Sequence, residues 1–171
     1  MAIIKEEINV NSMQLHPYGK KLVAHAMFYR GKNFLWAAKL LEEKGGYHYV
    51  VLHLLCQGLE IIIKSLLLMQ NYDKYKPKLK SKGGLGHNLV KCDKELRKEL
   101  FNKPLKKKDK DIMNELEILN NFYRKHLLRY GSVLDLFVEP KTISSDLVIR
   151  YASKLVRFGN RKFRIKKPTN M

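Results

Sequence analysis

Hydrophobic and polar positions follow a helical period along most of the chain. Apolar side chains recur three and four residues apart from Lys20 to Lys44, and Gly45 and Gly46 then end the pattern. From Tyr47 to Asn71 the apolar residues cover so wide a face that this segment is expected at the centre of a bundle. This part of the chain therefore predicts two helices joined by a short turn.

The remainder of the chain predicts a loop followed by three more helices. From Tyr72 to Leu85 lysines alternate with other residues, and proline and glycines interrupt the segment, which indicates an exposed, flexible loop. Helical patterns follow from His87 to about Asn102 and from Lys106 to Gly131. Ser144 or Ser145 can cap a last helix.

Together these elements predict an all-α fold, an antiparallel bundle of four to five helices with short-to-medium loops. We expect an N-terminal lead-in over residues 1–19, the helical bundle over 20–158 and a basic C-terminal tail over 159–171. A chain of 171 residues that is 45% hydrophobic is large and apolar enough to form one domain with a core.

The charge balance points to a negatively charged partner. Lysine and arginine number 34 against 16 aspartates and glutamates, a formal net charge of +18, which exceeds what solubility requires. The basic residues gather in three runs, with aromatic residues near them that can stack on unpaired bases: Lys74–Lys82, Lys103–Lys110 and Arg157–Lys167. One such run is usually a solvated surface, but three favour RNA or another polyanion, and the excess of lysine favours sequence-independent phosphate contacts.

Cysteine usage and hydropathy indicate a soluble, cytoplasmic protein with no membrane segment. Cys56 and Cys92 form no CxxC pair, so neither a disulfide framework nor a zinc ribbon is implied. The N-terminus carries acidic residues where a signal peptide would be apolar. The most apolar run, Leu59–Met69, is interrupted by Glu60 and Lys64 and is too short to span a bilayer.

A metal site is not predicted. His53, Cys56 and Glu60 share one helix face, but their spacing matches no zinc pattern, and buried cysteine and histidine are common without a metal. We therefore expect no metal and no cofactor.

Three stretches, taken together and in this order, resemble a HEPN domain. The first has a glutamate followed four residues later by lysine, the second is a Gly-His-Asn-Leu start to a helix, and the third closes in Arg-Tyr before a glycine. The stretches are LLCQGLEIIIKSLL at 54–67, GHNLV at 86–90 and LNNFYRKHLLRYG at 119–131. The resemblance covers residues 20–131.

The resemblance implies a helical bundle that commonly forms a homodimer. Many members are metal-independent ribonucleases of bacterial defence and toxin–antitoxin systems, paired with an antitoxin, and others bind nucleotides or a minimal nucleotidyltransferase. The ribonuclease branch carries an arginine a few residues before a histidine on the fourth helix. His126 takes the place of that histidine, but the upstream positions, Asn121 among them, hold no arginine. This departure leaves catalysis open.

Arg129 lies three residues after His126 and shares its helix face, so it can supply the missing positive charge. Metal-free RNA cleavage needs a base for the 2′-hydroxyl and a cation for the phosphorane, and these two side chains suit those roles. Alternatively, His126 lines a seam between helices and Arg129 interacts with the helix dipole at its C-terminus.

Other residues are candidates for binding RNA or a nucleotide. Glu60 and Lys64 either face a ligand cleft or form an ordinary ion pair. His87, at a helix start, either helps to hold an anion beside free N–H groups or caps and packs. Contacts are also predicted for five residues of the fourth helix and the basic runs: Lys107, Asn121, Arg124, Tyr130 and Arg161.

Three functions remain open from the sequence. The chain is an RNA-binding protein or ribonuclease, a non-catalytic partner for a nucleotide or a nucleotidyltransferase, or a structural module that binds an acidic protein. The wide apolar faces of the second and fourth helices favour a homodimer, because one small bundle does not obviously cover both.

Overall fold

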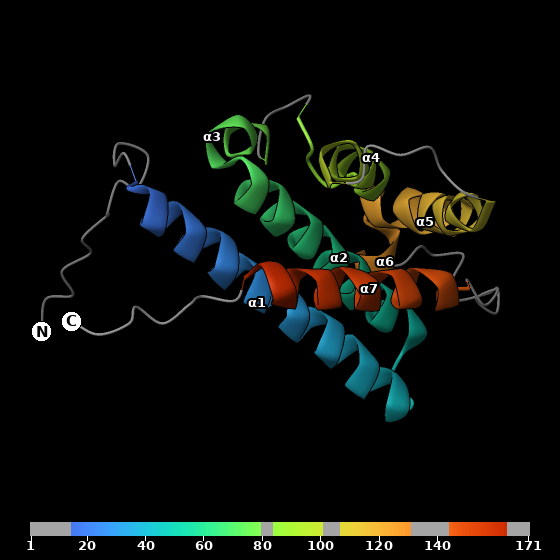
Figure 1. The fold of residues 1–171 in the computed structure, drawn as a ribbon. Coiled ribbons are helices and arrows are strands. Elements are labelled where there is room, and N and C mark those ends of the chain that lie inside the picture. Colours follow the sequence, from blue (N-terminus) through green and yellow to red (C-terminus); the bar gives the residue numbers. More distant parts are fainter. Residues whose placement is uncertain (1–14, 80–83, 101–106, 131–143, 164–171) are drawn as a thin grey trace, which may run out of the picture.

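The computed structural model describes residues 15–79, 84–100, 107–130 and 144–163, and within these ranges every regular element is helical (Figure 1). The all-α prediction is confirmed for this part of the chain. In chain order the elements are α1 (Pro17–Glu43), α2 (His48–Gln70), α3 (Tyr72–Tyr75), the 3-10 turn η1 (Pro77–Leu79), α4 (Leu89–Leu100), α5 (Lys107–Arg124), α6 (Leu127–Tyr130) and α7 (Asp146–Lys162).

The helices α1 and α2 form an antiparallel hairpin that organises the fold. Gly45, at φ +70°, provides the turn between them. Where the two helices cross, a Cβ on Gly31 would lie 2.7 Å from Ile62 Cγ1, and a Cβ on Gly58 would lie 3.0 Å from the carbonyl oxygen of Gly31. Glycine at both positions therefore lets the backbones approach closely, which offsets its low helix propensity.

The helix α2 is the centre of the core, as its pattern predicts. The helices α1, α4, α5, α6 and α7 all pack against it, and most of its apolar side chains are buried. Its apolar face, which suggested a second copy of the chain, is therefore covered by the chain's own helices. The apolar stripe of α5 is covered in the same way through Ile112, Leu116 and Leu119.

By length and composition alone, α2 is apolar enough to cross a membrane. However, 72% of its most apolar 18-residue window is buried inside the protein. Core helices of soluble proteins have the same composition, so this feature agrees with a central core helix.

The helix α7 crosses the α1–α2 hairpin, as Figure 1 shows. A Cβ on Gly159 would lie 2.2 Å from the ring of Phe28, and that ring stacks on Phe163 with 4.8 Å between centroids. The sequence pattern predicts that the helix stops at Gly159 and that the basic tail begins at this residue. The helix instead continues to Lys162, because this glycine is a packing residue on the buried face.

Two further predictions about boundaries are wrong. The helix α1 begins at Pro17, inside the predicted lead-in over residues 1–19, and this proline occupies the first turn as prolines often do. The predicted flexible loop is helical over Tyr72–Tyr75 and Pro77–Leu79, and Tyr75 is fully buried. The hydroxyl of Tyr75 donates to Glu95 across 3.3 Å, which ties this segment to α4.

Candidate functional site

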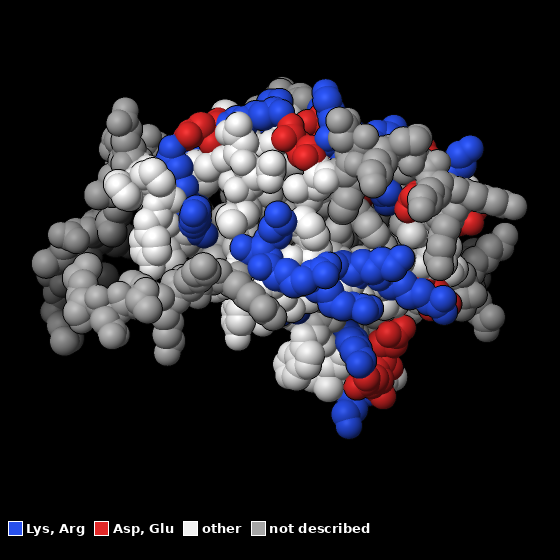
Figure 2. All heavy atoms as spheres, viewed as in Figure 1, with Lys and Arg blue, Asp and Glu red and all other residues white. Residues whose placement is uncertain are grey.

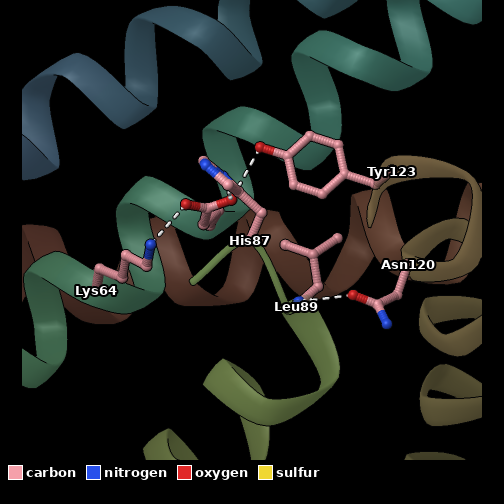
Figure 3. A network of polar contacts seen from close by, with 6 residues as sticks. Lys64, His87, Leu89, Asn120 and Tyr123 are labelled. Atoms are coloured by element: carbon pink, nitrogen blue, oxygen red, sulfur yellow. Dashed lines mark hydrogen bonds and ion pairs between the residues drawn. The ribbon is translucent and has the colours of Figure 1, made fainter. Parts of the chain in front are cut away.

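The carboxylate of Glu60 is the centre of a buried polar network. Figure 3 labels its partners Lys64, His87 and Tyr123. Oε1 accepts a hydrogen bond from Lys64 Nζ at 2.6 Å, and Oε2 accepts one from the hydroxyl of Tyr123 at 2.8 Å. Nδ1 of His87 lies 3.1 Å from the same Oε2. Only 5% of Glu60 is exposed, so these partners replace the water that a carboxylate needs.

This network brings together the three stretches that carry the HEPN resemblance. Glu60 comes from α2, His87 from the segment before α4, and Tyr123 from the end of α5. A second link joins the last two stretches, because Asn120 Oδ1 accepts a hydrogen bond from the backbone N–H of Leu89 at 2.8 Å. Segments that lie far apart in the sequence therefore meet at one carboxylate.

The pair Glu60–Lys64 is neither exposed nor presented to a ligand in this structure. Both side chains are less than one tenth exposed and bind each other directly. The pair therefore differs from an ordinary surface ion pair, because neither charge is screened by water. Its geometry describes a structural link inside the core rather than the edge of an open cleft.

His87 is the member of the network that reaches solvent, with 64% of its side chain exposed. One ring nitrogen is held by the buried carboxylate and the rest of the ring is accessible. Two backbone N–H groups at the start of α4 are already bonded, that of Leu89 to Asn120 and that of Lys91 to Asn88. The anion site predicted beside His87 therefore lacks these two donors.

The catalytic candidates His126 and Arg129 lie where the helix breaks between α5 and α6. The helix α5 ends at Arg124, α6 begins at Leu127, and His126 between them is exposed at φ +59°. The i,i+3 spacing that placed Arg129 on the helix face of His126 assumes one continuous helix, whereas His126 lies between α5 and α6. The pairing of the two side chains stays a prediction. The side chains of Arg129 and Tyr130 lie outside the described residues, as does that of Lys107.

Two other predicted contacts on α5 have exposed side chains. Asn121 and Arg124 both point away from the core, whereas their neighbour Asn120, which the sequence did not single out, is buried and bonded to α4. The structure therefore separates these two side chains from the Glu60 network.

The outward face of α7 carries a line of cations, which we call the α7 basic stripe. Its members are spaced four, three and four residues apart, so they share one helix face: Arg150, Lys154, Arg157 and Arg161. All are exposed, and the opposite face, with Tyr151, Ala152 and Leu155, is buried. Figure 2 shows blue side chains gathered in a band over α7.

The sequence prediction found only part of this stripe. It singled out Arg161 within a basic run that begins at Arg157, because a run is visible without knowing the fold. Arg150 and Lys154 stand among apolar residues and form no run. Their helical spacing relative to Arg157 was the available signal.

Two buried carboxylates hold α7 in place. Asp93 is fully buried and bonds Arg97 Nε at 2.5 Å and the hydroxyl of Tyr151 on α7. Burial, and then the charge of Asp93, raise the pKa of Tyr151 well above its ordinary value, so this phenol stays a donor. The α7 basic stripe therefore stands on a helix that is anchored to α4.

The second of these carboxylates caps the start of α7. Glu115 Oε1 accepts a hydrogen bond from the backbone N–H of Val148 at 2.9 Å, and Ser144 Oγ donates to Oε2 at 3.1 Å. Ser145 occupies the predicted cap position but its side chain makes no capping bond. The capping acceptor thus comes from α5, which fixes the position of α7 relative to the core.

Because both cysteine thiols are buried, we expect the stability of the fold to depend on pH. Burial, with a contribution from the charge of Glu60, raises the pKa of the Cys56 thiol, and burial raises the pKa of Cys92 to about 12. A thiol in the unfolded chain ionises at about pH 8.5, whereas the buried thiols stay protonated. The folded state is therefore fully favoured below that pH, and this advantage is lost as pH rises above it. We expect each thiol to lower the free energy of unfolding by up to about 1.4 kcal/mol per pH unit in this range.

Urea denaturation at about pH 7 and about pH 9.5 checks this expectation. The variant Cys56→Ala/Cys92→Ala should lose less stability between the two conditions than the unchanged chain. An equal loss in both proteins would show that the thiols do not ionise on unfolding as argued.

Comparison of the chain with protein-family models, with curated proteins and with solved structures finds no match in any of the three.

Proposed function

We propose that this chain is an RNA-binding protein of the HEPN-like helical type, and that the α7 basic stripe contacts the phosphate backbone. The observation that carries the proposal is the stripe itself. It places four cations along one exposed helix face, spanning about 17 Å at 1.5 Å per residue. Phosphates contacted in this way contribute affinity without base readout.

The anchoring of α7 supports this use of the stripe. Asp93 and Glu115 fix the helix from two sides through Tyr151 and Val148, so the cations project from a rigid support. A rigid array loses less conformational entropy on binding than a mobile basic segment does. The net charge of +18 adds long-range attraction for any polyanion.

The HEPN-like part of the proposal rests on a different observation. The three stretches that carry the resemblance converge on Glu60 through His87 and Tyr123. This convergence gives each of the three stretches a common structural role in the core. It supports a shared fold.

Charge replacement on α7 tests the proposed contact. We expect Arg150→Gln/Lys154→Gln/Arg157→Gln/Arg161→Gln to weaken binding of a labelled single-stranded RNA by about 100-fold, because four phosphate contacts are lost. Fluorescence anisotropy at a fixed salt concentration gives the affinities.

The matched control removes the same charge elsewhere, from four exposed lysines on α1's C-cap, α4 and α5: Lys44, Lys94, Lys98 and Lys110, each replaced by Gln. This control should lose no more than about tenfold, which reflects the lower net charge alone. If both variants lose the same affinity, the stripe is not the contact surface. If the unchanged chain does not bind RNA at low salt, the proposed function is wrong.

RNA cleavage is a second candidate, favoured by one observation. The imidazole of His87 is held at Nδ1 by a buried carboxylate and is otherwise accessible, an arrangement that orients a histidine for proton transfer. The same RNA is run on a gel without metal after incubation with the unchanged chain, with His87→Ala and with His126→Ala. Fragments lost only in His87→Ala assign the base to His87, fragments lost only in His126→Ala assign it to His126, and intact RNA throughout removes cleavage.

A further inference from the structure

The outward side of α1 carries a line of exposed large apolar side chains, which we call the α1 ridge. Its members and their exposed fractions are Tyr18 (57%), Leu22 (40%), Tyr29 (58%), Trp36 (68%) and Leu40 (41%). Single exposed hydrophobic residues are common on soluble proteins, but several large ones along one side of a helix mark a candidate interaction surface.

Helix geometry places all of these side chains on one line. At about 100° per residue they fall within about 40° of one another around the axis of α1. The buried side of the helix, with Ala24, Phe28, Gly31 and Ala38, faces the opposite way. Figure 1 shows α1 at the edge of the bundle.

The α1 ridge is symmetric about its middle residue. Leu22 and Trp36 each lie seven residues from Tyr29, and Tyr18 and Leu40 each lie eleven residues from it. A second α1 running in the opposite direction would therefore meet the ridge in register, with Tyr29 opposite Tyr29 on the two-fold axis. A two-fold interface needs such a self-complementary surface.

We propose that a second copy of this chain packs antiparallel on the α1 ridge. The exposed parts of three aromatic and two leucine side chains amount to roughly 500 Å² per copy, so the pair buries roughly 1,000 Å². That area reaches the lower bound for a specific, weak-to-moderate dimer. The proposal does not depend on RNA binding, because the ridge carries none of the stripe's cations.

Charges beside the ridge predict how this association depends on salt. Lys21 and Lys39 lie on the same flank of α1, so in the antiparallel pair Lys21 approaches Lys39 of the second copy. Glu43 pairs with Lys39 at 3.5 Å and offsets only part of this repulsion. Raising salt from about 0.1 M to about 1 M shortens the Debye length from about 10 Å to about 3 Å and should strengthen the dimer. RNA binding has the opposite salt dependence.

Sedimentation equilibrium over a concentration series tests the proposal. We expect a species with twice the 20.1 kDa mass of one chain, populated more strongly at high salt. The variant Tyr29→Ser/Trp36→Ser should weaken association by about tenfold or more, since aromatic residues dominate such interfaces. The control Ile118→Ser removes an exposed apolar residue (51% exposed) on α5, away from the ridge, and should associate like the unchanged chain.

A monomer at every concentration and salt condition would overturn the proposal, as would a dimer that the ridge variant leaves intact. Trp36, the single tryptophan, gives a second readout because its emission should shift to shorter wavelength on association. If that shift occurs only with anionic lipid vesicles while the chain stays monomeric, the ridge meets a membrane surface and not a second copy.

Discussion

Replacing Glu60 with alanine is expected to lower the free energy of unfolding by about 3–5 kcal/mol, because it leaves Lys64 buried without its partner. Tyr123 and His87 lose the same acceptor, and Tyr123 is buried as well. For a domain of this size the loss corresponds to a fall in melting temperature of roughly 10 °C or more. Thermal denaturation followed by circular dichroism measures it.

Two further variants separate the cost of an unpaired charge from the loss of the pair. Glu60→Met/Lys64→Met removes both charges and should be much closer to the unchanged chain than Glu60→Ala is. His87→Ala should cost less than about 1 kcal/mol, because this side chain is mostly exposed. Equal destabilisation by Glu60→Ala and by the double replacement would show that the buried pair is not what holds this region.

Replacing Asp93 with alanine is expected to have a similarly large effect, again about 3–5 kcal/mol, and to act on α7. Arg97 would keep its contact of 3.5 Å to Asp109 and its position over the ring of Tyr151. The buried hydroxyl of Tyr151 would lose its acceptor. Burial alone would lower the pKa of Arg97, but its charged neighbours, Asp93 among them, raise that pKa by more, so this guanidinium stays charged. A charged group without its buried partner is the source of the cost.

Urea denaturation measures this effect, with Glu43→Ala as the matched control. Glu43 forms the exposed ion pair with Lys39, also spaced i,i+4, and its loss should cost less than about 0.5 kcal/mol. Because Asp93 anchors α7, Asp93→Ala should also increase hydrogen exchange in that helix. An unchanged exchange rate in α7 would contradict the anchoring role.

Helical periodicity predicted most of the fold, because it depends on residues close in sequence. The limits of α2 follow from the apolar pattern and the glycines before it. The pattern failed where tertiary packing decides the outcome. The sequence predicts a helix stop at Gly159, but this glycine packs against Phe28 inside α7. The apolar stripe of α5 continues past Arg124 in the sequence, whereas the helix breaks at His126.

The candidate site was harder to predict, because its contacts join residues far apart in the chain. Glu60 and His87 were identified as polar residues of interest, but nothing in their local sequence indicates that they bond each other. Tyr123, Asp93 and Glu115 look like ordinary members of amphipathic helices. Their pairing becomes visible only when the fold brings their helices together.

The dependence of RNA affinity on salt tests the central claim most directly. For a single-stranded RNA, log affinity falls against log salt with a slope of about −0.7 for each phosphate contacted. The account predicts that Arg150→Gln/Lys154→Gln/Arg157→Gln/Arg161→Gln reduces the magnitude of this slope by about 3 relative to the unchanged chain, while the lysine control preserves it. An unchanged slope in the stripe variant would contradict phosphate binding by α7.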